Sequence, residues 1–393
     1  MTTAGIVCEY NPFHLGHYGH IEKTRRELDD DCAIVCVMSG NFVQRGDFAV
    51  FNKYSRALAA LRCGADLVVE LPAPYALSSA ESFASAGVQI LDALGVCDYL
   101  SFGSESGRIY ELADAAAALQ TDEFKKHFKE GLKQGYSYAQ AHQDAADFLL
   151  GKRSSVFMSP NNLLGILYLK AIAETGSRML PVTIKRTGGL LDGDCGYSAS
   201  ALRSLMRQDS EPWQYMPDAA AEVYREETSA GRGPVFMEAC ELAVLSRLRA
   251  VGDYSRLPGV SEGLHNRFKR YAVSEPTIEA ILGKVKTKRY AMSRLRRLLL
   301  SACLGITSED ARLPPQYIRV LGMNSTGRKL LSAAREKAKL PIITKPASVH
   351  NLPGDAALQF QIEVEATDFY VLAYPDKQNR AGGQEWRFTP VVI

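Results

Sequence analysis

The sequence lacks several features that would assign it to a familiar class of protein. None of its eight cysteines stands in a Cys-x-x-Cys pair, so the spacing of a zinc ribbon is absent. No run of about 18 consecutive apolar residues occurs, which argues against a membrane-spanning helix. The N-terminus has no basic segment followed by a long apolar run, so no signal peptide is expected and we predict a cytoplasmic protein. The cysteines are therefore expected to be buried, reduced thiols, with a reactive thiol at Cys195 as the less favoured alternative.

Two common nucleotide-binding motifs are also missing. There is no GxxxxGK[ST] P-loop, and no GxGxxG follows a strand, so neither P-loop phosphate transfer nor a dinucleotide redox site is supported. The net charge of +2 over 393 residues is close to neutral, so any RNA-binding surface must be a local patch. With 46% hydrophobic and 23% charged residues, the chain has an ordinary globular composition and a length typical of two or three domains.

Apolar runs and helical patterns alternate in the first half of the chain. Four of the runs end at turn-forming or polar residues: 4–9, 32–38, 66–71 and 98–102. This alternation predicts an α/β fold with a Rossmann-like, doubly wound parallel sheet in residues 1–208. A mainly helical region is predicted at 209–312, and a small α/β C-terminal part at 313–393. Ligands of such sheets bind outside the carboxyl ends of the strands, where the unusual polar clusters of this sequence fall.

The first of these clusters is an H-x-G-H motif between the first strand and the first helix. His14, Gly16 and His17 open that helix, whose unpaired N–H groups and partial positive charge suit a phosphate. Gly16 allows close backbone approach, and the two imidazoles can follow charge that develops on phosphorus. A metal site and simple helix capping are the alternatives. H-x-G-H in this context is typical of the HxGH nucleotidyltransferase superfamily. Its members activate a substrate at the α-phosphate of a nucleotide and release pyrophosphate.

A second cluster is the serine-rich turn at 195–203, which leads into another helix. It resembles the S-S-x-x-R loop that grips the triphosphate in that superfamily. Ser198 or Ser200 can cap the helix, and the remaining hydroxyl and Arg203 can bind departing pyrophosphate. We therefore predict catalytic roles for His14, His17, Ser200 and Arg203. An ordinary N-cap with a surface arginine one turn later is the alternative.

Further motifs identify the family that the chain resembles. The motifs are Val7–His20, the MSGNFVQRG run at 38–46, GADLVVELP at 64–72, SFGSE at 101–105, PNNLLG at 160–165, IKR at 184–186 and YPDKQ at 374–378. Together they cover essentially the whole chain and are similar to the tRNA(Met) cytidine acetate ligases. The resemblance implies that ATP and acetate form acetyl-adenylate, which then acetylates N4 of the wobble cytidine of elongator tRNA(Met). The chemistry of ATP leads us to expect that Mg²⁺ accompanies the nucleotide.

The resemblance also implies the residues that contact ATP. They are Val7, Cys8, Glu9, Tyr10, Asn11, Pro12, Phe13, His14, Leu15, Gly16, His17, Tyr18, Gly19, His20, Gly103, Asn161 and Arg186, with Asn162 as an alternative to Asn161. Either asparagine could instead cap the next helix, and Arg186 could form a surface ion pair. Gln44 and Arg45 could face acetate or the incoming cytidine. Lys53 and Arg56 could support the phosphates, but a solvated helix face is the favoured interpretation.

A basic stretch within residues 284–297 is the candidate RNA-binding surface. Its members are Lys284, Lys286, Lys288, Arg289, Arg294, Arg296 and Arg297. Phosphate backbones attract such stretches, and Tyr290 among them could stack on a splayed base. Arg267, Lys269 and Arg270 could extend the surface, and a solvated helix face is the alternative. Two other functions remain open, a small-molecule adenylyltransferase and an RNA-binding protein with a degenerate nucleotide fold. Sequence physics alone indicates neither the oligomeric state nor the acyl donor.

Overall fold

The computed structural model describes residues 1–186, 198–261 and 263–393. The strands are β1 (Thr3–Cys8), β2 (Ala33–Ser39), β3 (Phe42–Val43), β4 (Asp47–Phe48), β5 (Leu67–Leu71), β6 (Tyr99–Ser104), β7 (Leu180–Lys185), β8 (Ile318–Met323), β9 (Ile342–Ile343) and β10 (Val391–Val392). The first helices are α1 (Leu15–Leu28), α2 (Lys53–Arg62), α3 (Ala73–Ala76), α4 (Ala80–Leu94), α5 (Ile109–Gln120), α6 (Asp122–Lys133), α7 (Tyr138–Leu150) and α8 (Pro160–Thr175). The later helices are α9 (Ala199–Arg207), α10 (Asp218–Ser229), α11 (Glu241–Ala250), α12 (Leu264–Ser274), α13 (Ile278–Val285), α14 (Met292–Leu304), α15 (Ser325–Lys337) and α16 (Gly354–Val371).

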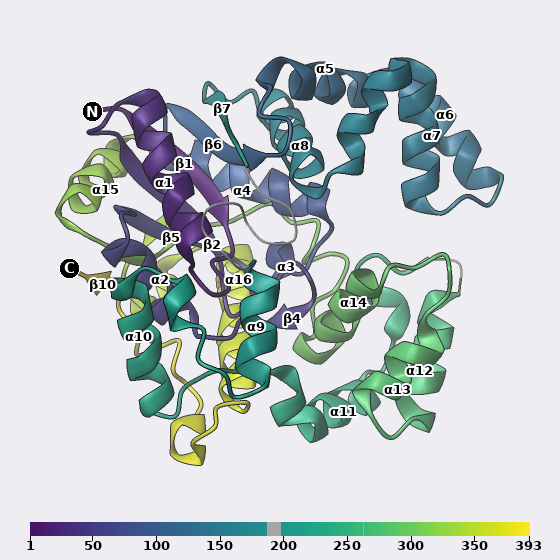
Figure 1. The fold of residues 1–393 in the computed structure, drawn as a ribbon. Coiled ribbons are helices and arrows are strands. Elements are labelled where there is room, and N and C mark those ends of the chain that lie inside the picture. The colour runs from purple at the N-terminus through teal and green to yellow at the C-terminus, as the bar shows by residue number, and fades with distance from the viewer. Residues whose placement is uncertain (187–197, 262) are drawn as a thin grey trace.

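The central sheet is mostly parallel and has the strand order β10-β8-β5-β2-β1-β6-β7 (Figure 1). The chain moves outward from β1 in both directions, through β2 and β5 on one side and through β6 and β7 on the other. The carboxyl end of β1 therefore lies at the point where the winding reverses, and this is where α/β sheets bind ligands. The Rossmann-like sheet expected from the sequence is thus present.

Helices cover both faces of this sheet. The central strands carry apolar side chains on each face, and these pack against the helices in two separate cores. Val35 and Val37 of β2 join a core with α4 and α8, whereas Ile34 and Cys36 join a second core with α1, α2 and α10. The side-chain period of two sends neighbouring residues to opposite faces. Near-continuous apolar strands are the pattern of a sheet that is buried between helices.

The strands after residue 313 join this same sheet. β8 pairs antiparallel with β5, and both β9 and β10 pair parallel with β8. The C-terminal part therefore extends the sheet of the N-terminal residues instead of forming a sheet of its own.

Helices α11 to α14 form a separate group beside the β3–β4 hairpin (Figure 1). Their shared core includes Phe42 and Phe48 of the hairpin and Phe369 and Tyr370 of α16. The aromatic rings of Phe48 and Tyr370 stack with centroids 5.7 Å apart. The helical group therefore packs against the hairpin and α16 through one shared apolar core.

No single helix among the described residues is long and apolar enough to span a membrane. Only the segments Gln140–Met158 and Pro160–Thr175 pass such a test together, and a bend of 119° separates them.

Candidate active site

The two histidines of the H-x-G-H motif lie at the start of α1, after the end of β1. His14 is the N-cap residue, and its Nδ1 accepts a hydrogen bond from the Gly16 N–H at 3.0 Å. The His14 N–H donates in turn to Nδ1 of His17 at 3.3 Å, and the two ring centroids are 3.8 Å apart. Because each Nδ1 accepts a hydrogen bond, a neutral ring carries its proton on Nε2. Both rings can therefore donate a hydrogen bond from Nε2.

The surroundings of His17 keep its ring neutral. Burial lowers its pKa well below the ordinary 6.5, and the neighbouring His14, Arg186 and His20 lower it further. At neutral pH the ligand-free site thus offers N–H donors at this position and no imidazolium charge. A bound anion would reverse part of this effect, since opposite charge favours the protonated ring.

His20, one turn further along α1, is held against β6. Its Nε2 lies 3.0 Å from the hydroxyl of Ser101, which in turn lies 2.7 Å from the hydroxyl of Thr24. Burial and the charges of Arg186 and Lys23 lower the pKa of His20 to about 4. The contact with Ser101 fixes the orientation of this ring against β6.

Several residues of the Val7–His20 stretch are turned into the protein. Tyr10 and Phe13 are buried, and the Tyr10 ring packs 4.9 Å from that of His17. The Phe13 N–H donates to the hydroxyl of Tyr224 at 3.0 Å, and Asn11 Oδ1 accepts from the Val50 N–H at 2.8 Å. Of the others, Pro12 is buried, Val7, Cys8, Glu9, Leu15, Gly16 and Gly19 are half-buried, and Tyr18 is exposed. These side chains shape the loop, so contacts from this stretch to a nucleotide would come largely from its backbone and histidines.

The serine-rich turn meets the H-x-G-H loop through Arg203. Ser198 caps α9 by accepting from the Ala201 N–H at 3.3 Å, whereas the side chain of Ser200 is exposed. Arg203 Nη1 donates to the Asn11 carbonyl at 2.7 Å. Burial lowers the pKa of Arg203 below its ordinary value. The structure thus brings α9 to the same edge of the sheet as the histidines, and the part of the turn at 195–197 lies outside the described residues.

Gly103 and Arg186 lie side by side at the carboxyl ends of β6 and β7. A Cβ at Gly103 would come within 3.2 Å of Arg186 Cγ, so a larger residue there would require the arginine side chain to shift by a few tenths of an ångström. Asn161 donates from Nδ2 to Glu105 Oε1 at 2.7 Å, and Asn162 Oδ1 accepts from the Ser106 N–H at 3.0 Å. The N-cap of α8 is Ser159, so neither asparagine has the capping role that was the alternative expectation.

An open pocket of about 560 Å³ lies beside the H-x-G-H loop, at the carboxyl end of β1. The loop after β1, the β3–β4 hairpin, α9 and the first turns of α14 form its walls. The lining residues are Glu9, Asn11, Val43, Gln44, Arg45, Asp47, Ser200, Arg203, Ser204, Arg207, Met292, Ser293 and Arg296. Ser204, Arg207, Asp47 and Ser293 were not among the candidates from the sequence. The sequence contains a signal for the α9 residues, because positions 200, 203, 204 and 207 follow the i, i+3, i+4, i+7 spacing of one helix face.

The basic stretch divides into an exposed part and a part that packs on the hairpin. Lys284, Lys286, Lys288 and Arg289 are exposed, on and after the end of α13. Arg294 donates to the Gly259 carbonyl at 2.6 Å, and Arg297 donates to the Gln44 carbonyl at 3.0 Å. Arg296 forms a 3.7 Å ion pair with Asp47 in the pocket wall. Tyr290 is buried, so the expectation that its ring could stack on a base is wrong.

The favoured expectation for Lys53 and Arg56, a solvated helix face, is also wrong. Both side chains are buried. Arg56 donates from Nε to the Phe51 carbonyl at 2.9 Å and from Nη2 to the Ser39 carbonyl at 3.0 Å, and it also binds the Glu9 and Gly40 carbonyls. It thereby fixes the ends of β1 and β2 relative to each other. Arg56 therefore has a structural role, because its guanidinium group donates its hydrogen bonds to backbone carbonyls.

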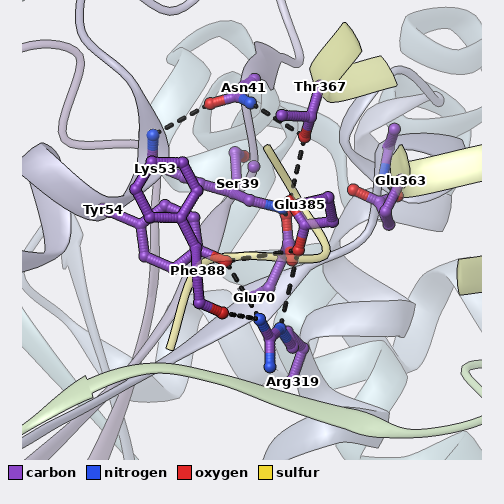
Figure 2. Close-up of polar contacts among 12 residues, drawn as sticks. Ser39, Asn41, Lys53, Tyr54, Glu70, Arg319, Glu363, Thr367, Glu385 and Phe388 are labelled. Atoms are coloured by element: carbon purple, nitrogen blue, oxygen red, sulfur yellow. Dashed lines mark hydrogen bonds and ion pairs between the residues drawn. The ribbon is translucent and has the colours of Figure 1, made fainter. Parts of the chain in front are cut away.

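Lys53 belongs to a buried network that joins the sheet to the C-terminal tail (Figure 2). Its Nζ lies 2.7 Å from Glu70 Oε1 and 2.8 Å from Glu385 Oε2. Arg319 and Glu363 complete a set of two cations and three carboxyl groups. Burial and the charge of Glu70 raise the pKa of Glu363 well above 4.5, whereas Lys53 and Arg319 hold the pKa of Glu385 below it.

The described cysteines are free thiols, as predicted, and most are buried. Burial raises the pKa of Cys32 to about 11, which leaves that thiol protonated. Cys195, the alternative reactive thiol, lies outside the described residues. Among the described residues, no group of three or more His, Cys, Asp or Glu side chains is placed to hold a metal ion.

Comparisons with known proteins agree with this geometry. Residues 1–385 match the family described as HIGH Nucleotidyl Transferase. The tRNA(Met) cytidine acetate ligase of Acetivibrio thermocellus is 37% identical, with 100% of both chains covered. That of Thermotoga maritima is 37% identical over 98% of this chain and 99% of its own.

Solved structures of Thermotoga maritima TmcAL superpose closely. The crystal structure bound with alpha-thio ATP has a TM-score of 0.93 and 36% identity, and the apo structure has a TM-score of 0.95 at the same identity. Each match covers 100% of both chains. With the motif, the fold and full-length relatives in agreement, the chain belongs to the tRNA(Met) cytidine acetate ligase family of HIGH nucleotidyl transferases.

Proposed function

We propose that this protein is an ATP-dependent ligase that activates acetate as acetyl-adenylate and transfers the acetyl group to N4 of the wobble cytidine, C34, of elongator tRNA(Met). Family membership supports the overall reaction, and the alpha-thio ATP bound to the Thermotoga maritima relative supports ATP as the nucleotide. The observation that carries the proposal is the H-x-G-H loop at the N-terminus of α1, where Nδ1 of both His14 and His17 accepts a backbone hydrogen bond and burial keeps the His17 ring neutral.

In the activation step an acetate oxygen attacks the α-phosphorus of ATP, and the bond from that phosphorus to the bridging oxygen of pyrophosphate breaks. His14 and His17 donate to oxygens on which negative charge develops, and the α1 N-terminus favours the same charge. Ser200 and Arg203 hold the departing pyrophosphate. Mg²⁺ enters with the phosphates, since it retains several waters and needs few protein ligands.

The adenosine would lie on the β6 and β7 side of β1. Gly103, Asn161 and Arg186 are the proposed contacts there, together with the backbone of Val7–His20. The tight approach of Gly103 to Arg186 supports a backbone surface beside a cation, which suits a ribose and its phosphate.

The tRNA would bind the exposed cations of the basic stretch. Lys284, Lys286, Lys288 and Arg289 lie close together in the chain without an intervening acidic residue, and their side chains are exposed. Such a cluster attracts phosphates without reading sequence, so it anchors the RNA. Arg296 lines the pocket and would be the member of the stretch that meets the target nucleotide itself.

Two assays test the proposal. Acetate-dependent exchange of labelled pyrophosphate into ATP measures adenylate formation, and nucleoside analysis after incubation with ATP, labelled acetate and bulk tRNA measures transfer. We expect exchange without tRNA, and label in N4-acetylcytidine only when tRNA is present. Exchange that is independent of acetate would favour a small-molecule adenylyltransferase. Absence of both activities would favour an RNA-binding protein with a degenerate nucleotide fold.

A further inference from the structure

The pocket beside the H-x-G-H loop has walls that the proposed ATP contacts do not account for. Its α9 wall carries Ser200 and Arg203, which the proposed function gives to pyrophosphate. The opposite wall comes from the β3–β4 hairpin and from Met292, Ser293 and Arg296 at the start of α14. A volume of about 560 Å³ exceeds the need of acetate, which has only four non-hydrogen atoms, and lies in the range of pockets for larger ligands.

The charges of this pocket suit a nucleotide within an RNA chain. Arg45, Arg203, Arg207 and Arg296 line it, against the two carboxylates of Glu9 and Asp47. Asp47 lies 3.5 Å from Arg207 and 3.7 Å from Arg296, so it holds two of the guanidinium groups in place. The remaining positive excess favours phosphate at the rim.

The α14 wall is continuous with the exposed basic residues. Lys288 and Arg289 precede Met292 by only a few residues in the chain, and α14 contacts the hairpin directly. Gly46, with a φ of +76°, lies so close that a Cβ there would stand 2.5 Å from the Arg297 backbone nitrogen. An RNA loop held by the basic stretch would therefore present a nucleotide at the pocket mouth.

Glu9 lies where this pocket meets the catalytic loop. Its Oε1 accepts from the Gln44 N–H at 2.6 Å, and Arg56 holds its carbonyl, so both the side chain and the backbone are fixed. The other carboxylate oxygen of Glu9, Oε2, makes no hydrogen bond to any residue in the described ranges. Glu9 is itself one of the residues that line the pocket. The pocket thus contains a carboxylate that is held in place through Oε1 and can accept a proton or a hydrogen bond at Oε2.

We propose that this pocket receives the target cytosine and that Glu9 is the general base of acetyl transfer, an inference that rests on the proposed function. N4 of the cytosine attacks the carbonyl carbon of acetyl-adenylate, and a C–N bond forms. The carbon–oxygen bond to the phosphate breaks, and AMP leaves with that electron pair. Glu9 Oε2 takes the proton that N4 loses, and the proton then passes to solvent.

The variant Glu9→Gln tests the chemical role. Glutamine keeps an oxygen for the Gln44 N–H but cannot accept a proton at neutral pH. Transfer is measured in a single turnover by mixing enzyme-bound acetyl-adenylate with tRNA, and activation is measured by pyrophosphate exchange. We expect transfer to fall by about 10²–10⁴-fold, the usual contribution of a general base, and exchange to fall by far less.

The variant Ser293→Trp tests the occupant, because an indole at the first turn of α14 would fill the pocket. Leu242→Trp, on an exposed face of α11, is the matched control and should behave as the wild type. We expect Ser293→Trp to raise the KM for tRNA at least about tenfold, with a much smaller change in the KM for ATP. Equal losses in exchange and transfer in either pocket variant would assign the pocket to the triphosphate and overturn the proposal, as would unimpaired transfer in Glu9→Gln. A wild type without exchange or transfer would instead refute the proposed function itself.

Discussion

Glu363 and Glu385, two buried carboxyl groups of one network, should respond oppositely to the same substitution. The network holds two cations, Lys53 and Arg319, and three carboxyl groups, so one carboxyl group can be neutral without leaving a cation unpaired (Figure 2). Glu385 touches both cations, at 2.8 Å from Lys53 and 3.6 Å from Arg319. Glu363 forms no ion pair with either cation among the described residues, and burial and the charge of Glu70 raise its pKa well above 4.5, which identifies it as the neutral member.

The structure sets the expected magnitudes. Glu363→Gln preserves the acceptor for the Ala73 N–H and removes no charge, so the free energy of unfolding should change by less than about 1 kcal/mol. Glu385→Gln removes the shared partner of two buried cations, and breaking such a pair costs about 3–5 kcal/mol. Since domains are stable by only about 5–15 kcal/mol, this loss should displace the urea midpoint strongly.

The two groups should also shape the pH dependence differently. The raised pKa of Glu363 means that the folded state keeps a proton that the unfolded chain loses above about pH 4.5, so stability falls as pH rises from there toward the folded pKa. Glu363→Gln should remove that decline. The lowered pKa of Glu385 contributes stability above its unfolded value that is lost as pH falls through the folded value. Urea unfolding followed by circular dichroism measures the Glu363 effect between about pH 4.5 and 8 and the Glu385 effect below about pH 4.5. Equal destabilisation by the two variants at pH 7 would refute the assignment of the neutral group.

Three further outcomes follow from the site. His17→Ala should lower pyrophosphate exchange by about 10²–10³-fold, the usual cost of one transition-state donor, with little change in the urea midpoint; an undiminished rate would remove His17 from catalysis. Changing Lys284 and Lys288 together to alanine should reduce the slope of log Kd for tRNA against log salt by about 0.7–0.9 for each lost phosphate contact, and unaltered affinity would return them to a solvated face. Arg297→Met should lower the free energy of unfolding by about 1–3 kcal/mol through the lost bond to Gln44, without altering that slope; a salt slope reduced as in the lysine variants would place Arg297 on the RNA.

Local patterns in the sequence were enough to predict the core of the fold. The apolar runs at 32–38 and 98–102 closely match β2 and β6. The antiparallel pairing of β8 with β5 was not predicted, because it joins residues about 250 positions apart and no local pattern encodes such a partner.

The errors at the site have a similar origin. A lysine and an arginine one turn apart usually indicate a solvated helix face, and the partner that buries Lys53, Glu385, lies more than 300 residues away in the chain. Likewise, Tyr290 and Arg297 stand in a strongly basic stretch, yet one is buried in the helical core and the other binds the hairpin. Sequence spacing correctly located the two histidines at the start of a helix, because that position depends on local helix geometry. The partners of buried charges depend on tertiary structure.

The ion pair between Glu385 and Lys53 forms only after the end of the chain has been synthesised. A ribosome releases Lys53, β1 and the H-x-G-H loop long before β8, β10 and Glu385 exist. Until then the sheet has an open edge at β5, and Lys53 lacks one of its two close carboxylate partners. A chain that stopped short of residue 385 would hold every proposed catalytic residue and still leave an incompletely paired cation buried between α2 and β5. Nascent or truncated chains are therefore expected to be poorly folded and open to chaperones and proteases, so that the cell contains few fragments able to bind ATP without completing the reaction.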